Sequence, residues 1–390
     1  MKKLFPMAAM LLAGIAAAPA AAQSPQDLTV ASFAVGGPDE VFAQLDILRP
    51  LAEKGAGKIA VLLPDTRSST RWMGADAPGF ERAFKQMGLT ADDYIISNAQ
   101  GSPQTQRTQA EQAITAGASV LLITNLDSGS GAAIQADAIS RGVTVIDYDR
   151  LTLNGSAQFY VSFDNKNVGE RMAQGLEQCI ADWKVEKPQI FHLGGSPTDN
   201  NATLVEQGYD EVLGRLYDAG KATRVGAVRV PNWDNQVGLT MFEQAWQANP
   251  QINAVLSGSD GLAQSVISVL KNRGVKPRTI PTTGQDAILY ALQNVLSDWQ
   301  CMTVYKPIYR QAAAAAAVAV MLRAGESLPE ALVNGSYDAE SHAVPSILLD
   351  LVTVTKENMK DTVVADRFVD PHELCVGDIA PLCTANGIDF

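Results

Sequence analysis

Three neighbouring polar residues, Asp199, Asn200 and Asn201, stand in the stretch GGSPTDNNATL, between an apolar run and a helix-like segment. Glycine and proline readily form a turn, and one Asp or Asn is enough to cap the helix that follows. Three such residues in a row exceed that need. We therefore expect the amides of Asn200 and Asn201 to contact a ligand, with Asp199 as the helix cap.

Residues of similar chemistry recur at the ends of other apolar runs. Carboxylate and amide oxygens accept hydrogen bonds, guanidinium and ammonium groups donate them, and an indole ring offers a flat apolar face. A sugar needs this mixture, because each hydroxyl both donates and accepts while the C–H face of a pyranose is apolar. The candidates are Arg67, Arg71, Trp72, Asp127, Asp149, Arg150, Asp199, Asn200, Asn201, Trp233, Asp260, Gln285, Asp286 and Lys306.

Structural roles stay open for several of these residues, because polar and aromatic side chains also stabilise folds without touching a ligand. These roles are an ion pair (Asp149, Arg150), core packing (Trp72, Trp233), a solvated strand-end charge (Lys306) and helix capping (Asp260, Asp286).

Paired carboxylates also serve glycosidases as acid and nucleophile, which makes an enzyme the opposing interpretation. Such an enzyme keeps one acid protonated in a dry pocket, whereas here each acid has a basic or amide neighbour. The chain contains no GxSxG or HExxH motif, no Cys/His nucleophile arrangement and no phosphate-binding glycine loop, and its three histidines are far apart. We predict a binding protein with no catalytic residue, cofactor or metal.

The elements that must position these residues are strand-like runs alternating with helix-like runs from about Gly57 onward, as is typical of parallel α/β sheets. Their polar ends form two series of similar order and spacing: Asp65, Asn98, Asp127 and Asp149, then Asp199, Trp233, Asp260 and Asp286. We therefore predict two similar doubly wound domains. Since ligands bind beyond the carboxyl ends of the strands in open α/β sheets, two such domains would enclose one cleft and close on it about a hinge.

The N-terminus has the composition of an export signal. Residues 1–22 comprise a basic MKK start, a short apolar run and a small-residue end at Ala22. The apolar run is shorter than the ~20 residues that span a bilayer, and no cysteine follows it as a lipid attachment site. We predict cleavage after Ala22 and a periplasmic location.

The chain of 390 residues carries a formal net charge of −12 and no basic run, which argues against nucleic acid and anionic lipid as partners. Export permits disulfides. Cys375 and Cys383 would close a small loop, whereas Cys179 and Cys301 could be either a disulfide or two buried thiols.

Taken together, these motifs resemble the periplasmic sugar-binding proteins of ABC importers, in the ribose/xylose class of type I periplasmic binding proteins. Xylose-binding and multiple-sugar-binding members are the most similar. The resemblance covers residues 57–361 and is carried by SSTRW, VTVIDYDRLTLNGSAQFYVSFDNKNVGE, LGGSPTDNNA, AVLSGSDGLAQSVISVLKNRGV, TGQDA and AVPSILLDLVTVTKENM.

The resemblance implies an α/β fold of two doubly wound parallel-sheet domains joined by a three-stranded hinge. The implied parts are a signal peptide (1–22), an N-terminal extension (23–56), a first sugar-binding domain (57–160 plus 305–338), a second sugar-binding domain (161–304 plus 339–365) and a C-terminal tail (366–390). The extension and the tail have no counterpart in the family. Each either docks a partner or packs against the back of a domain.

Carried over position by position, the family's ligand contacts fall on Arg67 or Ser68, Arg71, Asp127, Asp149, Arg150, Asn200, Asn201, Trp233, Asp260, Asp286 and Lys306. The first loop, PDTRSSTRW, is one residue longer than usual, so Arg67 and Ser68 could exchange roles. The implied protein is a monomeric receptor that hands a pentose or hexose, xylose-like by preference, to an ABC permease. The alternatives are a chemoreceptor or sensor kinase as partner, and another polyol such as a cyclitol as ligand.

Overall fold

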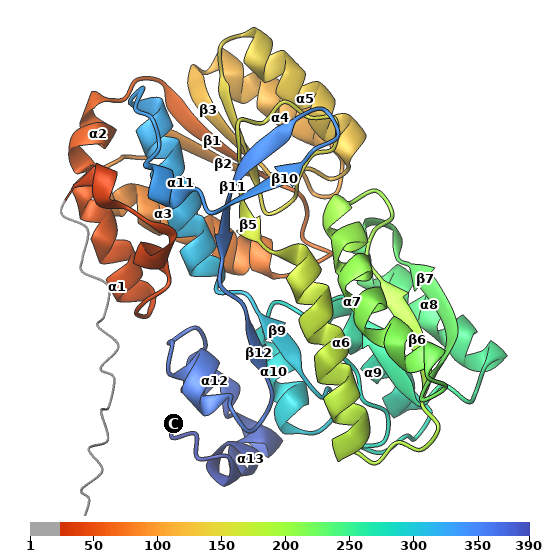
Figure 1. Cartoon of the computed structure of the whole chain (residues 1–390). Helices are drawn as coiled ribbons and strands as arrows, with labels where there is room; N and C mark the ends of the chain where they lie inside the picture. Colours follow the sequence, from red (N-terminus) through yellow and green to blue (C-terminus); the bar gives the residue numbers. More distant parts are fainter. Residues whose placement is uncertain (1–23) are drawn as a thin grey trace, which may run out of the picture.

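The protein is described by a computed structural model that covers residues 24–390, so the predicted signal peptide lies outside the described residues. Figure 1 shows two domains, each a sheet flanked by helices, with the chain passing back and forth between them. Within residues 24–390, no helix combines the length and the apolar character needed to cross a membrane.

The first domain contains a seven-stranded sheet in the order β10-β11-β5-β4-β3-β1-β2. Its neighbouring strands are parallel except for the β10–β11 hairpin at one edge. The strands are β1 (Lys58–Leu63), β2 (Tyr94–Asn98), β3 (Ala118–Ile123), β4 (Thr144–Tyr148), β5 (Phe159–Phe163), β10 (Gly335–Asp338) and β11 (Ala343–Leu349). The helices are α1 (Pro38–Ala43), α2 (Arg49–Lys54), α3 (Ala77–Gln86), α4 (Pro103–Thr115), α5 (Ser128–Ser140) and α11 (Ile308–Arg323).

Both faces of this sheet are covered by helices. Along β1, Val61 packs in the cluster that contains α3 and α11, while its neighbour Leu62 packs in the cluster that contains α4 and α5. A strand buried on both faces needs a continuous apolar run rather than an alternating one, which explains the sequence KIAVLL. The doubly wound arrangement predicted from the sequence is confirmed.

The second domain is built in the same way on a shorter sheet, β7-β6-β8, whose strands are parallel. Single bridges at Thr282 and Gln285 lead from β8 to β9, which pairs with β12 in antiparallel fashion. The strands are β6 (Gln189–Gly194), β7 (Thr223–Arg229), β8 (Ala254–Ser257), β9 (Thr303–Tyr305) and β12 (Val352–Val354). The helices are α6 (Asn165–Asp182), α7 (Asn200–Asp218), α8 (Asn235–Ala248), α9 (Asp260–Asn272), α10 (Leu289–Leu296), α12 (Pro371–Leu374) and α13 (Ala380–Ala385).

The chain passes between the domains three times: after β5, between β9 and α11, and between β11 and β12. The last passage differs from the expected boundary at residue 339. Strand β11 pairs with β5 in the first sheet, with Ser346 opposite Tyr160, so residues 343–349 lie with the first domain. The chain therefore passes to the second domain only after Leu349.

The N-terminal extension packs on the first domain. Phe42, Leu45 and Leu48 are buried in the same cluster as α3 and α11. The C-terminal tail packs on the second domain instead, because Leu374 and Cys383 belong to a cluster with α10, β9 and β12. Packing against a domain, one of the two expected roles of these segments, is thus what the structure shows.

The extension and the tail also contact each other across the two domains. The Arg367 guanidinium of the tail pairs with Asp39 (3.3 Å) and Glu40 of α1. Next to it, the Asp366 carboxylate accepts hydrogen bonds from Arg310 (2.6 Å) and Tyr309 (2.8 Å) of α11. We call these ion pairs the clasp. In Figure 1 the tail helices lie below α1, on the side away from α7 and α8.

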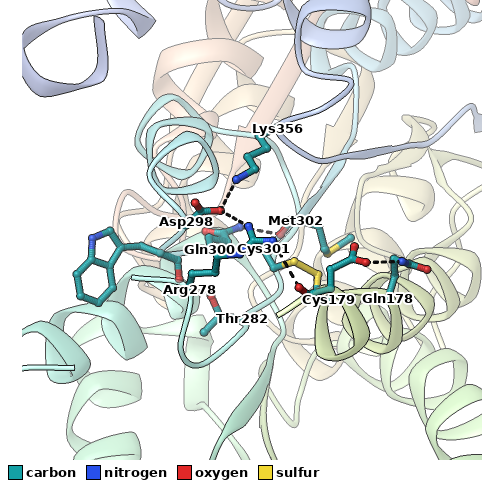
Figure 2. The surroundings of a disulfide bond; sticks show 11 residues. Gln178, Cys179, Arg278, Thr282, Asp298, Gln300, Cys301, Met302 and Lys356 are labelled. Carbon is teal, nitrogen blue, oxygen red and sulfur yellow. Dashed lines mark hydrogen bonds and ion pairs between the residues drawn. A yellow bond between two sulfur atoms is a disulfide. The ribbon is translucent and has the colours of Figure 1, made fainter. Parts of the chain in front are cut away.

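Two disulfides are present. One joins Cys179 of α6 to Cys301, two residues before β9, with the Cα atoms 6.1 Å apart. Figure 2 shows this bond beside Asp298, which pairs with Arg278 and Lys356. The other joins Cys375 to Cys383 within the tail, with the Cα atoms 5.9 Å apart.

Candidate ligand-binding site

A polar cavity lies between the two domains, beyond the carboxyl ends of their strands, which is where open α/β sheets bind ligands. Nearly all of its wall is buried. The first domain contributes Ser68, Ser69, Arg71, Trp72, Asp149 and Arg150, the second contributes Asn165, Asp199, Asn201, Trp233, Ser259, Gln285 and Asp286, and Lys306 follows β9.

The loop after β1 brings Ser68 and Trp72 to the cavity. The carboxylate of Asp65 accepts hydrogen bonds from the backbone N–H groups of Arg67 (2.7 Å) and Ser68 (2.6 Å), which folds the loop back on itself. The Ser68 hydroxyl donates to Asp65 (2.8 Å) and accepts from the indole N–H of Trp72 (3.0 Å). The Trp72 ring is thereby held in one orientation at the cavity wall.

Arg71 organises the charges on the side of the first domain. Its buried guanidinium donates two hydrogen bonds to Asp76 (2.9 and 2.8 Å), one to Asp149 (2.9 Å) and one to Gln311 (2.8 Å). Burial by itself would raise the pKa of Asp149, but the positive charges of Arg71, Lys306 and Arg150 outweigh it and lower that pKa. Asp149 is therefore ionised at neutral pH.

Besides the Arg71–Asp149 pair, three ion pairs link charges around the cavity, two of them between residues of opposite domains. Arg150 contacts Asp199 (3.1 Å), and Arg71 contacts Asp286 (3.7 Å). Lys306 contacts the same Asp286 oxygen at 2.7 Å. The side chains are at least 90% buried, so these charges are screened little by water.

Asp199 and Asn201 build the wall on the side of the second domain. One oxygen of Asp199 caps α7 by accepting the backbone N–H of Asn201 (2.9 Å), and the other accepts the indole N–H of Trp233 (2.8 Å). Asn201 donates its side-chain amide to the backbone carbonyl of Asp149 (2.8 Å), which links the two domains. Asp199 is therefore both the predicted cap and part of the cavity wall.

Some acceptors in the wall have unused hydrogen-bonding capacity. Within the described part of the chain, the buried side-chain oxygen of Gln285 has no donor. Asp286 Oδ1 faces Lys306 and Arg71 as an ion pair but has no well-aligned hydrogen bond. A buried acceptor without a donor is costly, so these two oxygens favour a further donor from water or from a ligand.

Four of the predicted contact residues do not line the cavity. The side chain of Arg67 is 78% exposed, and its backbone carbonyl accepts a hydrogen bond from Asn235 (3.0 Å). Asn200 is the first residue of α7 and lies outside the wall. Asp127 caps α5, because both of its oxygens accept hydrogen bonds from Ser130 (2.8 and 2.6 Å).

Asp260 is the fourth of these residues and lies beneath the wall. Its carboxylate accepts hydrogen bonds from the side chains of Gln300 (2.8 Å) and Thr303 (2.8 Å) and from the backbone of Ile288 (3.1 Å). Burial and the charge of Asp286 raise the pKa of Asp260 to about 7. Asp260 supports the loop that presents Gln285 and Asp286 rather than facing the cavity itself.

Three wall residues were missed by sequence reasoning: Ser69, Asn165 and Ser259. Ser69 and Ser259 neighbour predicted residues, but a single serine in a loop carries no signal. Asn165 follows β5 in the stretch FDN, at a strand end like the other candidates. Position alone could have identified it. Among residues 24–390, no cluster of His, Cys, Asp and Glu side chains is suited to hold a metal.

Comparison with known proteins identifies the family to which this architecture belongs. A family model described as a periplasmic binding protein domain matches residues 59–327. The D-xylose-binding periplasmic protein of Escherichia coli (strain K12) is 35% identical over 321 residues, which are 81% of this chain and 92% of the relative. The multiple sugar-binding periplasmic receptor of Rhizobium radiobacter is 28% identical over 332 residues, covering 82% and 92%.

Comparison with solved structures leads to the same class of protein. A carbohydrate transporter solute binding protein from Chloroflexus aurantiacus, in complex with D-glucose, superimposes with a TM-score of 0.72 at 25% identity, covering 81% of this chain and 97% of that one. The relatives are named as binding proteins, the class predicted from the sequence, and not as enzymes. With most of its length matched in family, sequence and fold, the chain belongs to the periplasmic binding proteins.

Proposed function

We propose that this protein is an exported receptor that binds one monosaccharide, a pentose or a hexose with xylose-like molecules preferred, in the cavity between its domains. It then delivers the sugar to an ABC permease. The observation that carries the proposal is the mixture in the cavity wall, where ion-paired donors, unsatisfied acceptors and two indole rings surround one space.

The charges of the wall favour a neutral ligand. Three cations, Arg71, Arg150 and Lys306, are paired with the carboxylates of Asp149, Asp199 and Asp286. No cation is left over to neutralise an anionic ligand, and no carboxylate is left over for a cationic one. Hydroxyl groups, by contrast, can donate to the open positions on Gln285 and Asp286 without bringing a charge.

The relatives narrow the class of sugar. One is named for D-xylose, another for multiple sugars, and two solved neighbours hold glucose. Pyranoses of this kind present an apolar face that can lie on Trp72 or Trp233. A cyclitol shares the same ring of hydroxyls and is the alternative ligand class.

Binding is coupled to domain closure in this proposal. The ligand would contact both sides of the cleft and so favour the closed state over the open one. Three passages of the chain allow such a hinge motion. We propose domains of residues 57–163 plus 307–349 and 164–306 plus 350–365, with the extension attached to the first and the tail to the second.

The location and the partners follow from the same proposal. Residues 1–22 act as a signal peptide cleaved after Ala22, so that the mature chain works in the periplasm as a monomer. The alternative partner is a chemoreceptor or sensor kinase that binds the closed form. Sugar uptake by cells lacking the protein separates the two, because only a transport role makes uptake depend on it.

The test is calorimetric titration of the mature protein with D-xylose, D-glucose, D-galactose, L-arabinose, D-ribose and myo-inositol. We expect one or two of them to bind at micromolar concentration, about −8 kcal/mol. Asp286→Asn should weaken that binding about tenfold to hundredfold, since a hydrogen bond to a charged group contributes about 1.5–3 kcal/mol. Asp127→Asn, the same change at a strand end outside the cavity, should leave the affinity unchanged. No heat from any of these ligands with a folded protein would refute the proposal.

A further inference from the structure

The indole of Trp233 lies directly on the main chain of two glycines. Asn232 and Trp233 both have left-handed backbone conformations, with φ of 55° each, which turn the side chain of Trp233 toward β6 and β8. A Cβ atom added to Gly195 would lie 2.1 Å from Cη2, 2.1 Å from Cζ2 and 2.5 Å from Cε2 of Trp233. One added to Gly258 would lie 3.3 Å from Cζ3.

Space, and not backbone conformation, is what requires glycine at position 195. Gly195 is not among the residues with a left-handed φ, so its backbone is open to other amino acids. The three distances place its missing side chain over the face of the six-membered ring of Trp233. Carbon atoms in contact need about 3.5–4.0 Å. A methyl group would therefore displace the ring by about 1.5 Å.

The displaced ring would have to move into the cavity or tilt. Trp233 lines the cavity, and its indole N–H is held by Asp199 at 2.8 Å, while the same carboxylate oxygen pairs with Arg150. A shift of 1.5 Å is about half the length of that hydrogen bond. The depth of the ring is thus coupled to a charge pair that joins the two domains.

We propose that Gly195 is a positioning residue for ligand binding: it sets how deeply Trp233 sits and so determines the room and the stacking surface left for the sugar. The inference rests on the proposed sugar-binding function and names a residue that is not itself part of the cavity wall. Gly194 supplies the matched control. The nearest neighbours of a Cβ atom there would be Tyr209 at 3.3 Å, Val228 at 3.5 Å and Arg229 at 3.8 Å, and no atom of Trp233 lies as close as these.

The experiment is a cycle of four proteins, wild type, Gly195→Ala, Trp233→Phe and the double variant, titrated calorimetrically with D-xylose and D-glucose. Gly195→Ala should lower the affinity of the better ligand at least tenfold, whereas Gly194→Ala should change it less than threefold. A phenyl ring lacks the Cζ2 and Cη2 atoms that meet the added methyl group. The double variant should therefore bind within twofold of Trp233→Phe alone.

Three results would overturn the inference. The first is wild-type affinity in Gly195→Ala. The second is a double variant in which the two losses multiply, because Gly195 would then act independently of Trp233. The third is a Gly195→Ala protein that does not fold and is not restored by Trp233→Phe. If the wild type binds no sugar, the proposed function fails. In that case none of the four proteins will give a heat of binding in the titration.

Discussion

The disulfide between Cys179 and Cys301 should contribute strongly to the stability of the second domain. It encloses 122 residues of sequence, all in that domain, and ties α6 to the strand that leads to Lys306 (Figure 2). We take as the perturbation the double variant Cys179→Ala/Cys301→Ala. The loop of the tail disulfide, Cys375–Cys383, spans only 8 residues and provides the matched comparison.

The magnitude follows from the conformational entropy that a cross-link removes from the unfolded chain. That entropy is about 2.1 cal/mol/K plus a term that grows with the logarithm of loop length. At 25 °C the loop of 122 residues gives about 5 kcal/mol, and the loop of 8 residues about 2.5 kcal/mol. The first value is comparable to the whole stability of many domains.

Urea unfolding followed by tryptophan fluorescence would measure the loss. Of the five tryptophans only Trp72 lies in the first domain, so the signal reports mainly on the second. We expect the free energy of unfolding to fall by about 5 kcal/mol in Cys179→Ala/Cys301→Ala and by about half as much in Cys375→Ala/Cys383→Ala. Losses of equal size, or a loss below ~2 kcal/mol for the longer loop, would show that loop entropy does not set the stability here.

Two further predictions concern pH and the clasp. Burial raises the pKa of Asp147 to about 7, above its usual value of 3.8, so the folded protein keeps a proton that the unfolded chain has lost between these two pH values. Stability should therefore fall as pH rises through this window, by at most ~1.4 kcal/mol per pH unit for this group, and Asp147→Asn should flatten the slope measured by urea unfolding at pH 5, 6 and 7. An unchanged slope in the variant would contradict the assignment. In the clasp, Arg367→Glu places a carboxylate beside Asp39 and Glu40, and hydrogen exchange in residues 24–56 should become faster. Adding Glu40→Arg to Arg367→Glu should restore slow exchange if charge is the cause, since Asp39 keeps its pair with Arg82, and failure to restore it would point to packing instead.

The two-domain architecture was predictable because its signal is local. Each parallel strand is buried on both faces and so reads as an apolar run, and each run ends in a polar residue at the cleft. The sheet to which β11 belongs was not predictable, for the opposite reason. Whether β11 pairs with β5 or with the second sheet depends on contacts between residues far apart in the chain, such as Ser346 and Tyr160. No local pattern distinguishes the two pairings.

The cavity wall was predictable in composition but not in detail. Arg71 illustrates the limit. Its partners are Asp76, five residues away across a π-helical turn, and Gln311, on a helix that returns from the second domain. Asp260 illustrates a different limit. It is a strand-end carboxylate that lies under the wall, because neighbouring side chains donate hydrogen bonds to it. A residue's type and its place at a strand end do not reveal which way the side chain faces.

One distinction could nevertheless have been drawn from the sequence. Asp127 and Asp199 both precede helices and both cap them with one oxygen, so the second oxygen decides whether the residue faces the cleft. In DSGS the residue three positions after Asp127 is Ser130, whose hydroxyl takes that oxygen at 2.6 Å. In DNNA the corresponding residue is Ala202, which has no donor, and the oxygen is left for Trp233 and Arg150. Helix capping and a place in the cavity wall are therefore compatible roles for an acidic residue at a strand end. For these two residues, the side chain at the third helical position distinguishes the carboxylate that only caps from the one that also builds the cavity wall.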